Sequence, residues 1–263
     1  MCIRGRPRDT AFRAAFARFE TVLTELMAEL PLLRQPVGIN PKGKIARRMY
    51  RAALPHSDGL TTPMICVAGA VAEEVLAAMV DATDLTRAYV NNGGDIALHL
   101  TDGATFKIAV ASPDGQNLGT VAITSTDPIR GIATSGQRGR SLSLGIADAV
   151  TVLARSASMA DAAATRLGNT VDLPDHPAVK RVPANSLRDD TDLGSAPVVT
   201  HVGRLSQTDV AQALEHGEAA ANRMSTAHLI HGAALFLQGQ SRTLGLPERM
   251  KQIQKDPHPC LTS

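Results

Sequence analysis

The residues best suited to chemistry form three short clusters in the middle of the chain. In the first cluster, Asn91 and Asn92 precede the glycine pair Gly93 and Gly94, and Asp95 follows. Adjacent glycines let a backbone approach a ligand closely, with no side chain to obstruct its N–H groups. Asp95 could then receive ribose hydroxyls or hold a metal-bound water. The same residues are typical of a tight hairpin turn, so both interpretations stay open.

The second cluster combines hydroxyl, glycine and arginine residues directly after an apolar segment. It runs from Thr134, Ser135 and Gly136 to Arg138 and Arg140. Hydroxyls and backbone N–H groups donate to phosphate oxygens, and guanidinium groups balance phosphate charge. The cluster lacks the Gly-Lys-Ser/Thr ending of a Walker loop. It therefore indicates either a phosphate-binding loop of another kind or a flexible exposed loop.

The third cluster is a carboxylate and a hydroxyl spaced four residues apart. Asp161 and Thr165 stand at i and i+4 in an alanine-rich segment, so on a helix their oxygens share one face. Such a pair suits Mg²⁺, which takes one or two protein groups and completes its shell with phosphate and water. The alternative is that Asp161 only complements the dipole at the start of its helix.

The elements that position these clusters are predicted from hydrophobic periodicity. Apolar residues recur at three- and four-residue steps in the predicted helices and alternate in the predicted strands. The helices are predicted over 9–35, 61–80, 157–167 and 207–221, and the strands over 87–90, 96–100, 106–111, 121–125, 131–134 and 148–155. Residues 171–197, which contain four prolines, are predicted to form an extended surface crossing. Because helices and hairpin-like strands are segregated, an α+β layer architecture is favoured over a doubly wound parallel sheet.

Composition and charge narrow the classes of partner. Only 3% of the 263 residues are aromatic and Trp is absent, which argues against stacking of single-stranded nucleic acid on aromatic side chains. Residues 1–53 hold 11 Lys and Arg against 4 Asp and Glu. This basic arm is either a solvated helix face with a mobile terminus or a landing site for an anionic ligand or partner.

The cysteines and the apolar segments indicate the compartment. Cys2, Cys66 and Cys260 are odd in number and show no paired spacing, which favours a reducing environment. The longest apolar run, residues 64–72, is shorter than the ~20 residues of a membrane span. We therefore expect a cytoplasmic protein without a membrane partner. We also expect one domain over 1–263, with a helix and basic arm at 1–40, a motif-bearing core at 60–170 and a tail at 244–263.

In this order the clusters resemble the ApbE superfamily, whose best-known members are Mg²⁺-dependent FAD:protein FMN transferases. Residues 69–72 resemble its Gly-Ala-x-Ala helix, and residues 92–95 its Gly-Gly turn. Residues 134–136 resemble its Thr-Ser-Gly loop, and residues 160–165 its Ala-Asp-x-x-x-Thr metal helix. The likeness spans about residues 60–170 and is closest to an ApbE-like branch of the superfamily.

The resemblance implies a fold, a cofactor and a set of site residues. The fold would be a two-layer, T-fold-related α+β architecture of antiparallel sheets with helices packed on them. Asp161 and Thr165 would hold Mg²⁺ with the Ala70 carbonyl as a third ligand. Through this Mg²⁺, Asp161 would take part in catalysis at the FAD pyrophosphate. Arg138 or Arg140 would offset the negative charge on the departing AMP. The flavin-nucleotide pocket would be lined by Asn92, Gly93, Gly94, Asp95, Thr134, Ser135 and Gly136.

Two departures from the family pattern leave the activity open. The His-x-x-Asp-Pro block that carries the transferases' catalytic histidine is shortened to residues 140–145, without histidine, and Glu73 replaces an expected lysine. The first hypothesis is a Mg²⁺-dependent FAD-binding protein that transfers FMN to a protein hydroxyl or to water. The alternatives are a flavin-binding module without turnover and a small-molecule enzyme linked to sulfur assimilation, in which Cys66 would matter. A homodimer is also left open.

Overall fold

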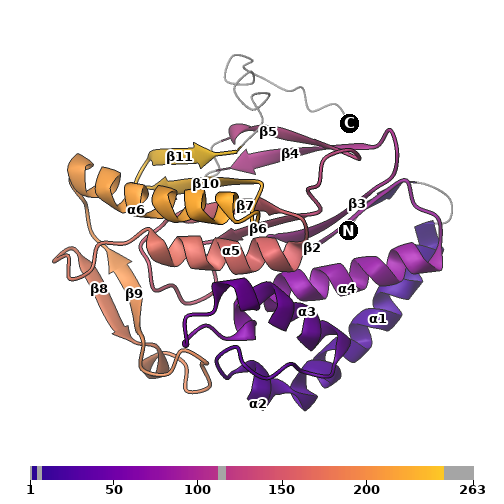
Figure 1. Ribbon diagram of the computed structural model, residues 1–263, viewed down its shortest axis with the longest axis horizontal. Helices are drawn as coiled ribbons and strands as arrows, with labels where there is room; N and C mark the ends of the chain where they lie inside the picture. The colour runs from indigo at the N-terminus through magenta and orange to yellow at the C-terminus, as the bar shows by residue number, and fades with distance from the viewer. Residues whose placement is uncertain (1, 5–7, 112–116, 246–263) are drawn as a thin grey trace.

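A seven-stranded antiparallel sheet forms the centre of the protein (Figure 1). The computed structural model describes residues 2–4, 8–111 and 117–245. In this part of the chain the strand order is β1-β2-β3-β6-β7-β10-β11, and every neighbouring pair runs antiparallel. The strands are β1 (Cys2–Arg4), β2 (Arg87–Asn92), β3 (Asp95–Leu100), β6 (Gly131–Ser135), β7 (Ala149–Ala154), β10 (Gly232–Leu237) and β11 (Gln240–Leu244).

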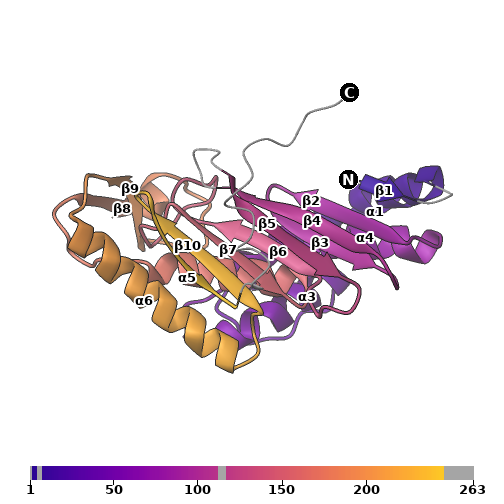
Figure 2. The same ribbon diagram turned by 90° about the horizontal axis from the view of Figure 1, so that it is seen from above.

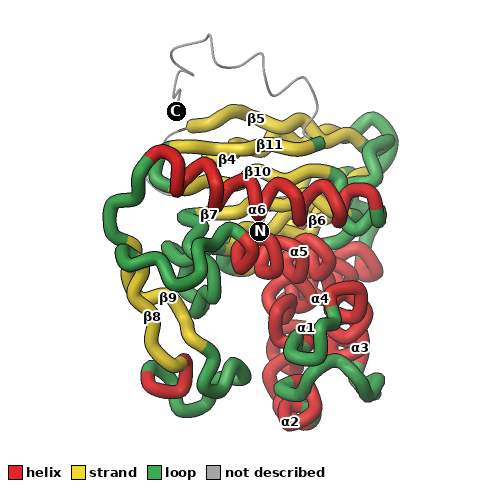
Figure 3. Tube along the Cα trace, turned by 60° about the vertical axis from the view of Figure 1, so that its left-hand side comes forward, coloured by secondary structure: helices red, strands yellow, loops and turns green. Residues whose placement is uncertain are grey.

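Helices cover one face of this sheet. The helices α4 (Val67–Ala82), α5 (Ala157–Thr170) and α6 (Gln207–Thr226) pack on the strands. The helices α1 (Arg8–Ala28), α2 (Leu30–Leu33) and α3 (Lys44–Ala53) lie outside them, with the 3₁₀ turns η1 (Leu54–His56) and η2 (Pro63–Cys66). Figure 3 shows the helices grouped on one side of the strands. The predicted α+β class, with antiparallel strands and helices packed on them, is confirmed.

A two-stranded ribbon covers the other face of the sheet. It consists of β4 (Thr105–Ala111) and β5 (Asn117–Thr124), which lie above β2, β3 and β6 in Figure 1 and overlap them in the view from above in Figure 2. Side chains of a strand point alternately to its two faces. On β10, Leu235 therefore joins the core under α5 and α6, whereas Phe236 packs with Val121 and Ile123 of the ribbon. The sheet is thus buried on both faces in its central part.

The central helix α4 is apolar along most of its length. Of the described residues, only Pro63–Ala82 is long and apolar enough to cross a membrane by length and composition, and 56% of that window is buried inside the protein. Helix α4 lies between α1 and strands β2 and β3. This position accounts for its hydropathy, because a helix packed on both sides exposes little surface to water.

The structure corrects two sequence predictions about the elements. The helix predicted over 9–35 is interrupted after Ala28 and continues as the single turn α2, whose first turn contains Pro31. The predicted extended crossing at 171–197 holds strand β8 (Val179–Pro183) and the 3₁₀ turn η3 (Ala184–Ser186), and β8 pairs with β9 (Pro197–Val202). The tail predicted from residue 244 lies, from 246 on, outside the described residues.

Candidate functional site

One cleft of about 480 Å³ brings the three sequence clusters together. Its walls come from η2 and the first turn of α4, the turn between β2 and β3, the end of β6 with the loop after it, helix α5, and the loop before β9. These segments are far apart in sequence. The predicted site residues that line the cleft are Asn92, Gly93, Asp95, Thr134, Ser135, Gly136, Asp161 and Thr165.

The glycine pair forms the hairpin turn that the sequence left as an alternative, and it also forms a wall of the cleft. Asn92 and Asp95 are the last register pair of β2 and β3. Gly93 has a φ of +72°, and a Cβ there would overlap with the Arg140 guanidinium. Gly94 also has a positive φ, and its N–H donates to Asn91 Oδ1 at 2.8 Å, but it does not line the cleft. The hairpin turn is therefore present, and a ligand-binding role of its residues stays a prediction.

Asp161 is placed in the cleft by the crossing of α4 and α5. Gly69, in the first turn of α4, lies so close to α5 that a Cβ there would overlap with the Ala157 carbonyl. Because the helices approach this closely, Asp161 Oδ2 accepts a hydrogen bond of 2.9 Å from the Gly69 N–H. The N-cap residue of α4, Cys66, makes no side-chain cap of its own. Asp161 therefore caps a neighbouring helix, a role different from complementing its own helix dipole.

The carboxylates of the cleft influence each other. Asp161 is 9% exposed, and burial raises its pKa well above the usual range, with the nearby Asp95 carboxylate as the next cause. Burial also raises the pKa of Asp95, to about 6, against the opposing effects of the Thr134 N–H and the Arg140 charge. Among the described residues no cationic side chain pairs with Asp161. A bound cation would lower the cost of keeping both groups ionised.

The oxygen donors near Asp161 fit a hard cation. Thr165 lines the same cleft, and its Oγ1 donates to the Ile65 carbonyl at 3.2 Å. In the described part of the chain, no group of three or more His, Cys, Asp or Glu side chains is arranged to hold a metal. Two carboxylates and a hydroxyl suit Mg²⁺, which relies on phosphate and water for its remaining positions.

Besides Gly94, two further predicted residues lie elsewhere. Arg138 forms an ion pair of 3.0 Å with the buried Asp148 and does not line the cleft, whereas Arg140 does. Ala70, predicted as a carbonyl ligand, is fully buried within α4 and is absent from the cleft wall. Ala68, two residues earlier, does line it, and its carbonyl accepts a bond of 3.1 Å from Asn92 Nδ2.

A loop that the sequence prediction missed forms part of the cleft wall. Arg188, Thr191 and Asp192 line the cleft from the segment between η3 and β9. Asp192 Oδ2 accepts a bond of 2.5 Å from Thr62 Oγ1, and Arg188 Nη2 donates to the Arg140 carbonyl at 3.1 Å. The acidic run from Asp189 to Asp192 could have indicated a functional loop. The prolines of the 171–197 segment instead favoured the prediction of an extended surface segment.

The thiol and the histidines take no part in the cleft wall. Cys66 is fully buried, and its Sγ donates to the carbonyls of Met49 and Pro63. Burial raises the pKa of this thiol well above its usual range, so it is not a reactive thiolate. No described histidine lines the cleft, in agreement with the shortened block at 140–145.

Comparison with known proteins gives curated relatives and solved structures of similar fold. The chain is 36% identical over 165 residues to a UPF0280 protein of Methanothrix thermoacetophila, covering 60% of this chain and 68% of the relative. It is 39% identical over 131 residues to a UPF0280 protein of Methanosarcina acetivorans, covering 49% and 50%. The matched segments therefore cover between 50% and 68% of these relatives' lengths.

Two solved structures are similar over most of this chain. The apo form of the flavinyl transferase ApbE of Pseudomonas stutzeri has a TM-score of 0.47 at 15% identity, covering 91% of this chain and 86% of that one. The flavin transferase ApbE of Vibrio cholerae has a TM-score of 0.39 at 14% identity, covering 94% and 77%. The family model described as AbpE bacteria matches residues 2–243. The chain, with its glycine turn, its Thr-Ser-Gly loop and its Asp-x-x-x-Thr helix in that order, therefore belongs to this ApbE-like family.

Proposed function

We propose that this protein binds FAD in the cleft and, with Mg²⁺, cleaves its pyrophosphate, transferring FMN to an acceptor hydroxyl or to water. The observation that carries the proposal is the buried Asp161 carboxylate, which has no cationic partner among the described residues and shares a cleft with Thr165 and Asp95. The flavin transferases named among the similar structures indicate the class of substrate.

The oxygen-bearing side chains of the cleft suit the coordination of Mg²⁺. Asp161 and Thr165 would hold Mg²⁺, with Asp95 close enough for its charge to act on Asp161. When bound, the ion supplies neutralisation of the pyrophosphate charge and polarisation of the phosphorus under attack. The cleft volume of about 480 Å³ lies within the range of small-molecule sites.

The protein's own groups orient the phosphates and balance charge. Thr134 and Ser135 line one wall, where the Thr134 N–H bonds the Asp95 carboxylate and the Thr134 hydroxyl contacts Thr151 Oγ1. Gly93 leaves room for the backbone to approach a ligand. Arg140 rather than Arg138 faces the cleft, so Arg140 offsets the charge that develops on the departing AMP. In the reaction a bond forms between the FMN phosphorus and the acceptor oxygen, the bond to the AMP oxygen breaks, and the acceptor's proton passes to a cleft carboxylate or to water.

The test is release of AMP from FAD, measured by liquid chromatography with and without MgCl₂. We expect AMP only when Mg²⁺ is present, and at least a hundredfold less AMP from Asp161→Asn. Asp209→Asn is the control, because Asp209 also accepts from a backbone N–H at a helix start, in the capping box of α6, but lies outside the cleft. No turnover by the unaltered protein, or equal turnover by Asp161→Asn, would contradict the proposal.

A milder substitution separates metal binding from folding. Thr165→Val keeps the shape of the side chain and removes the hydroxyl oxygen that faces the cleft. We expect the Mg²⁺ concentration for half-maximal AMP release to rise several-fold, while the maximal rate at saturating Mg²⁺ changes less. An unchanged Mg²⁺ dependence would remove Thr165 from the metal site.

A second candidate function is flavin-nucleotide binding without turnover. The absence of histidine from the cleft wall in the described residues favours it, because the family's transferases depend on that side chain. In this case the purified protein would retain FAD and release it intact on denaturation, and no AMP would form with Mg²⁺. The sulfur-linked alternative has no support from Cys66, whose thiol is buried and hydrogen-bonded.

A further inference from the structure

A second cavity, of about 490 Å³, lies between helix α3 and the first turn of α5. It shares no lining residue with the cleft described above. Four cationic side chains line it, together with a single carboxylate, that of Glu73. The cationic residues are Lys44, Arg47, Arg48 and Arg51.

The four cationic residues share one face of α3 by sequence spacing. Positions 44, 47, 48 and 51 follow steps of three and four residues, which place side chains on one side of a helix. Helix α3 contains no acidic residue that could compensate them within the helix. Like charges four residues apart destabilise a helix unless something neutralises them.

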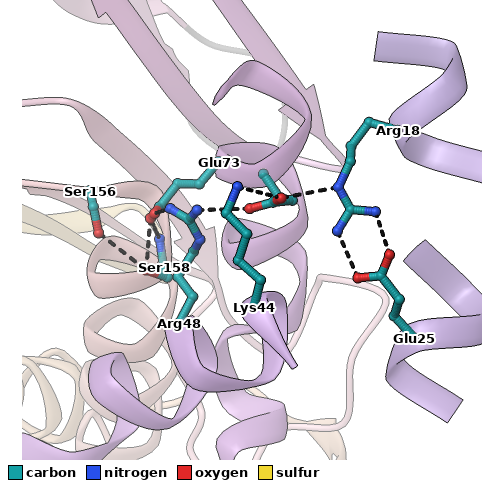
Figure 4. A network of polar contacts seen from close by, with 8 residues as sticks. Arg18, Glu25, Lys44, Arg48, Glu73, Ser156 and Ser158 are labelled. Carbon is teal, nitrogen blue, oxygen red and sulfur yellow. Dashed lines mark hydrogen bonds and ion pairs between the residues drawn. The ribbon is translucent and has the colours of Figure 1, made fainter. Parts of the chain in front are cut away.

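Two of the four charges are neutralised inside the protein, as Figure 4 shows. Arg48 bonds Glu73 at 2.5 Å and Glu74 at 2.9 Å, and Lys44 lies 3.0 Å from Glu74. Glu73 also accepts bonds from the N–H and the hydroxyl of Ser158 at 2.6 and 2.7 Å. Arg48 is therefore held rigidly at the cavity wall by two carboxylates that are themselves anchored.

The other two charges have no such partner. Arg47 and Arg51 are exposed, and no carboxylate within the described ranges lies at ion-pair distance from either. They are one turn apart on α3, so both guanidinium groups can approach one ligand. Guanidinium groups bind phosphate through paired, charge-assisted hydrogen bonds.

The rest of the cavity wall is partly apolar, with His56, Ser156 and Ser158 as its further polar residues. Ala52, Pro55, Met159 and Leu229 line it beside the cationic residues. This combination suits a ligand with an anionic group and an apolar body. A cavity volume of about 490 Å³ lies within the range of small-molecule sites.

We propose that this cavity is a binding site for a small organic phosphate. Arg47 and Arg51 bond its phosphate group, Arg48 and Lys44 add positive potential, and the apolar wall covers its organic part. The proposal is independent of the function of the cleft, because the two cavities share no lining residue.

The test is calorimetric titration with phenyl phosphate and with inorganic phosphate at low ionic strength. Two doubly substituted proteins are compared, each lacking two positive charges: Arg47→Gln/Arg51→Gln, and the control Arg13→Gln/Arg204→Gln, whose arginines are exposed and line neither cavity. We expect the phenyl phosphate Kd to rise at least tenfold in the first variant and to stay within twofold in the control. We also expect phenyl phosphate to bind several-fold more tightly than inorganic phosphate.

Folding and site identity are checked in the same series. Removing two neighbouring like charges should leave the Tm of Arg47→Gln/Arg51→Gln unchanged or raised, so lost binding cannot be ascribed to unfolding. Arg140→Gln should leave the binding event that depends on Arg47 and Arg51 unchanged. Equal losses in both double variants, equal affinity for the two phosphates, or binding of a tetraglutamate peptide in place of either phosphate would overturn the proposal.

Discussion

At the scale of single residues, two arginines in one loop have different roles. Arg138 pairs with the buried Asp148, which also accepts bonds from Gln137 Nε2 at 3.2 Å and from the Gln238 N–H at 2.6 Å. Arg140 lines the cleft, and its charge acts on Asp95. Of these two arginines, Arg140 is therefore the one available to a ligand in the cleft.

This difference gives a prediction for ligand affinity. Arg140→Gln should raise the Kd for FAD about tenfold or more, because a charge-assisted hydrogen bond contributes roughly 1.5–3 kcal/mol. Arg138→Gln removes the same charge two residues away and should change this Kd less than twofold. Flavin fluorescence titration measures both. Equal effects would mean that the whole loop, and not one guanidinium, determines binding.

Most of the residues that line the cleft could be predicted from the sequence. Which of two neighbouring loop residues, such as Arg138 and Arg140, faces the cleft could not. Asp161, Thr165 and Thr134 could be assigned because motif spacing places each on a definite helix face or strand end. Arg138 and Arg140 sit in an irregular loop, where no periodicity determines direction. Asp192 was missed because its place in the cleft depends on a contact with Thr62, 130 residues away in sequence.

At the scale of elements, helices α4 and α5 cap each other. Asp161 of α5 accepts from the Gly69 N–H in the first turn of α4. Glu73 of α4 accepts from the Ser158 N–H in the first turn of α5. The close crossing at Gly69 and Ala157 makes both bonds possible. This explains the acidic residue at 73, where the family resemblance leads one to expect lysine.

Because each helix accepts hydrogen bonds from the start of the other, substitution of Glu73 should lower the stability of the protein considerably. Glu73→Ala removes the acceptor of the Ser158 N–H and one partner of Arg48, whereas the Ser156 cap of α5 remains, so it should lower the free energy of unfolding by about 2–3 kcal/mol. Glu218→Ala is the control, because Glu218 makes only a half-exposed ion pair of 3.7 Å with Arg242. We expect at most about 0.5 kcal/mol there. Urea unfolding measures both, and similar losses would refute the capping role.

Prediction of the elements themselves succeeded where periodicity was strong and failed where prolines dominated. The alanine-rich segment before Gly168 was predicted as a helix and is α5. In the 171–197 segment, Pro183 and Pro197 face each other as register partners at one end of the β8–β9 hairpin. Prolines are tolerated at such ends because no ladder N–H is needed there, and a sequence pattern cannot show that two such ends meet.

At the scale of the whole molecule, acid stability should depend on His56. This residue is 9% exposed, and burial, with the Arg166 charge as a second cause, lowers its pKa to about 4. In the unfolded chain the imidazole takes up a proton near pH 6.5, so stability falls as the pH drops from about 6.5 to about 4. The loss is roughly 3 kcal/mol, at 1.36 kcal/mol per pKa unit.

The measurement compares the unaltered protein with His56→Leu by urea unfolding at pH 7.5 and at pH 4. The difference in unfolding free energy between the two proteins should change by roughly 3 kcal/mol in favour of His56→Leu at the lower pH. Asp95 and Asp161 have raised pKa values and act in the opposite direction, but they are present in both proteins and cancel. A pH-independent difference would show that His56 titrates normally in the folded state.

The capping of α4 by Asp161 has a consequence for the fold as a whole. The same carboxylate holds the opening turn of the central helix and faces the cleft. A ligand that binds the Asp161 carboxylate must compete with the Gly69 N–H for its lone pairs. Ligand affinity in the cleft and the stability of the α4 N-terminus are therefore coupled through this one side chain.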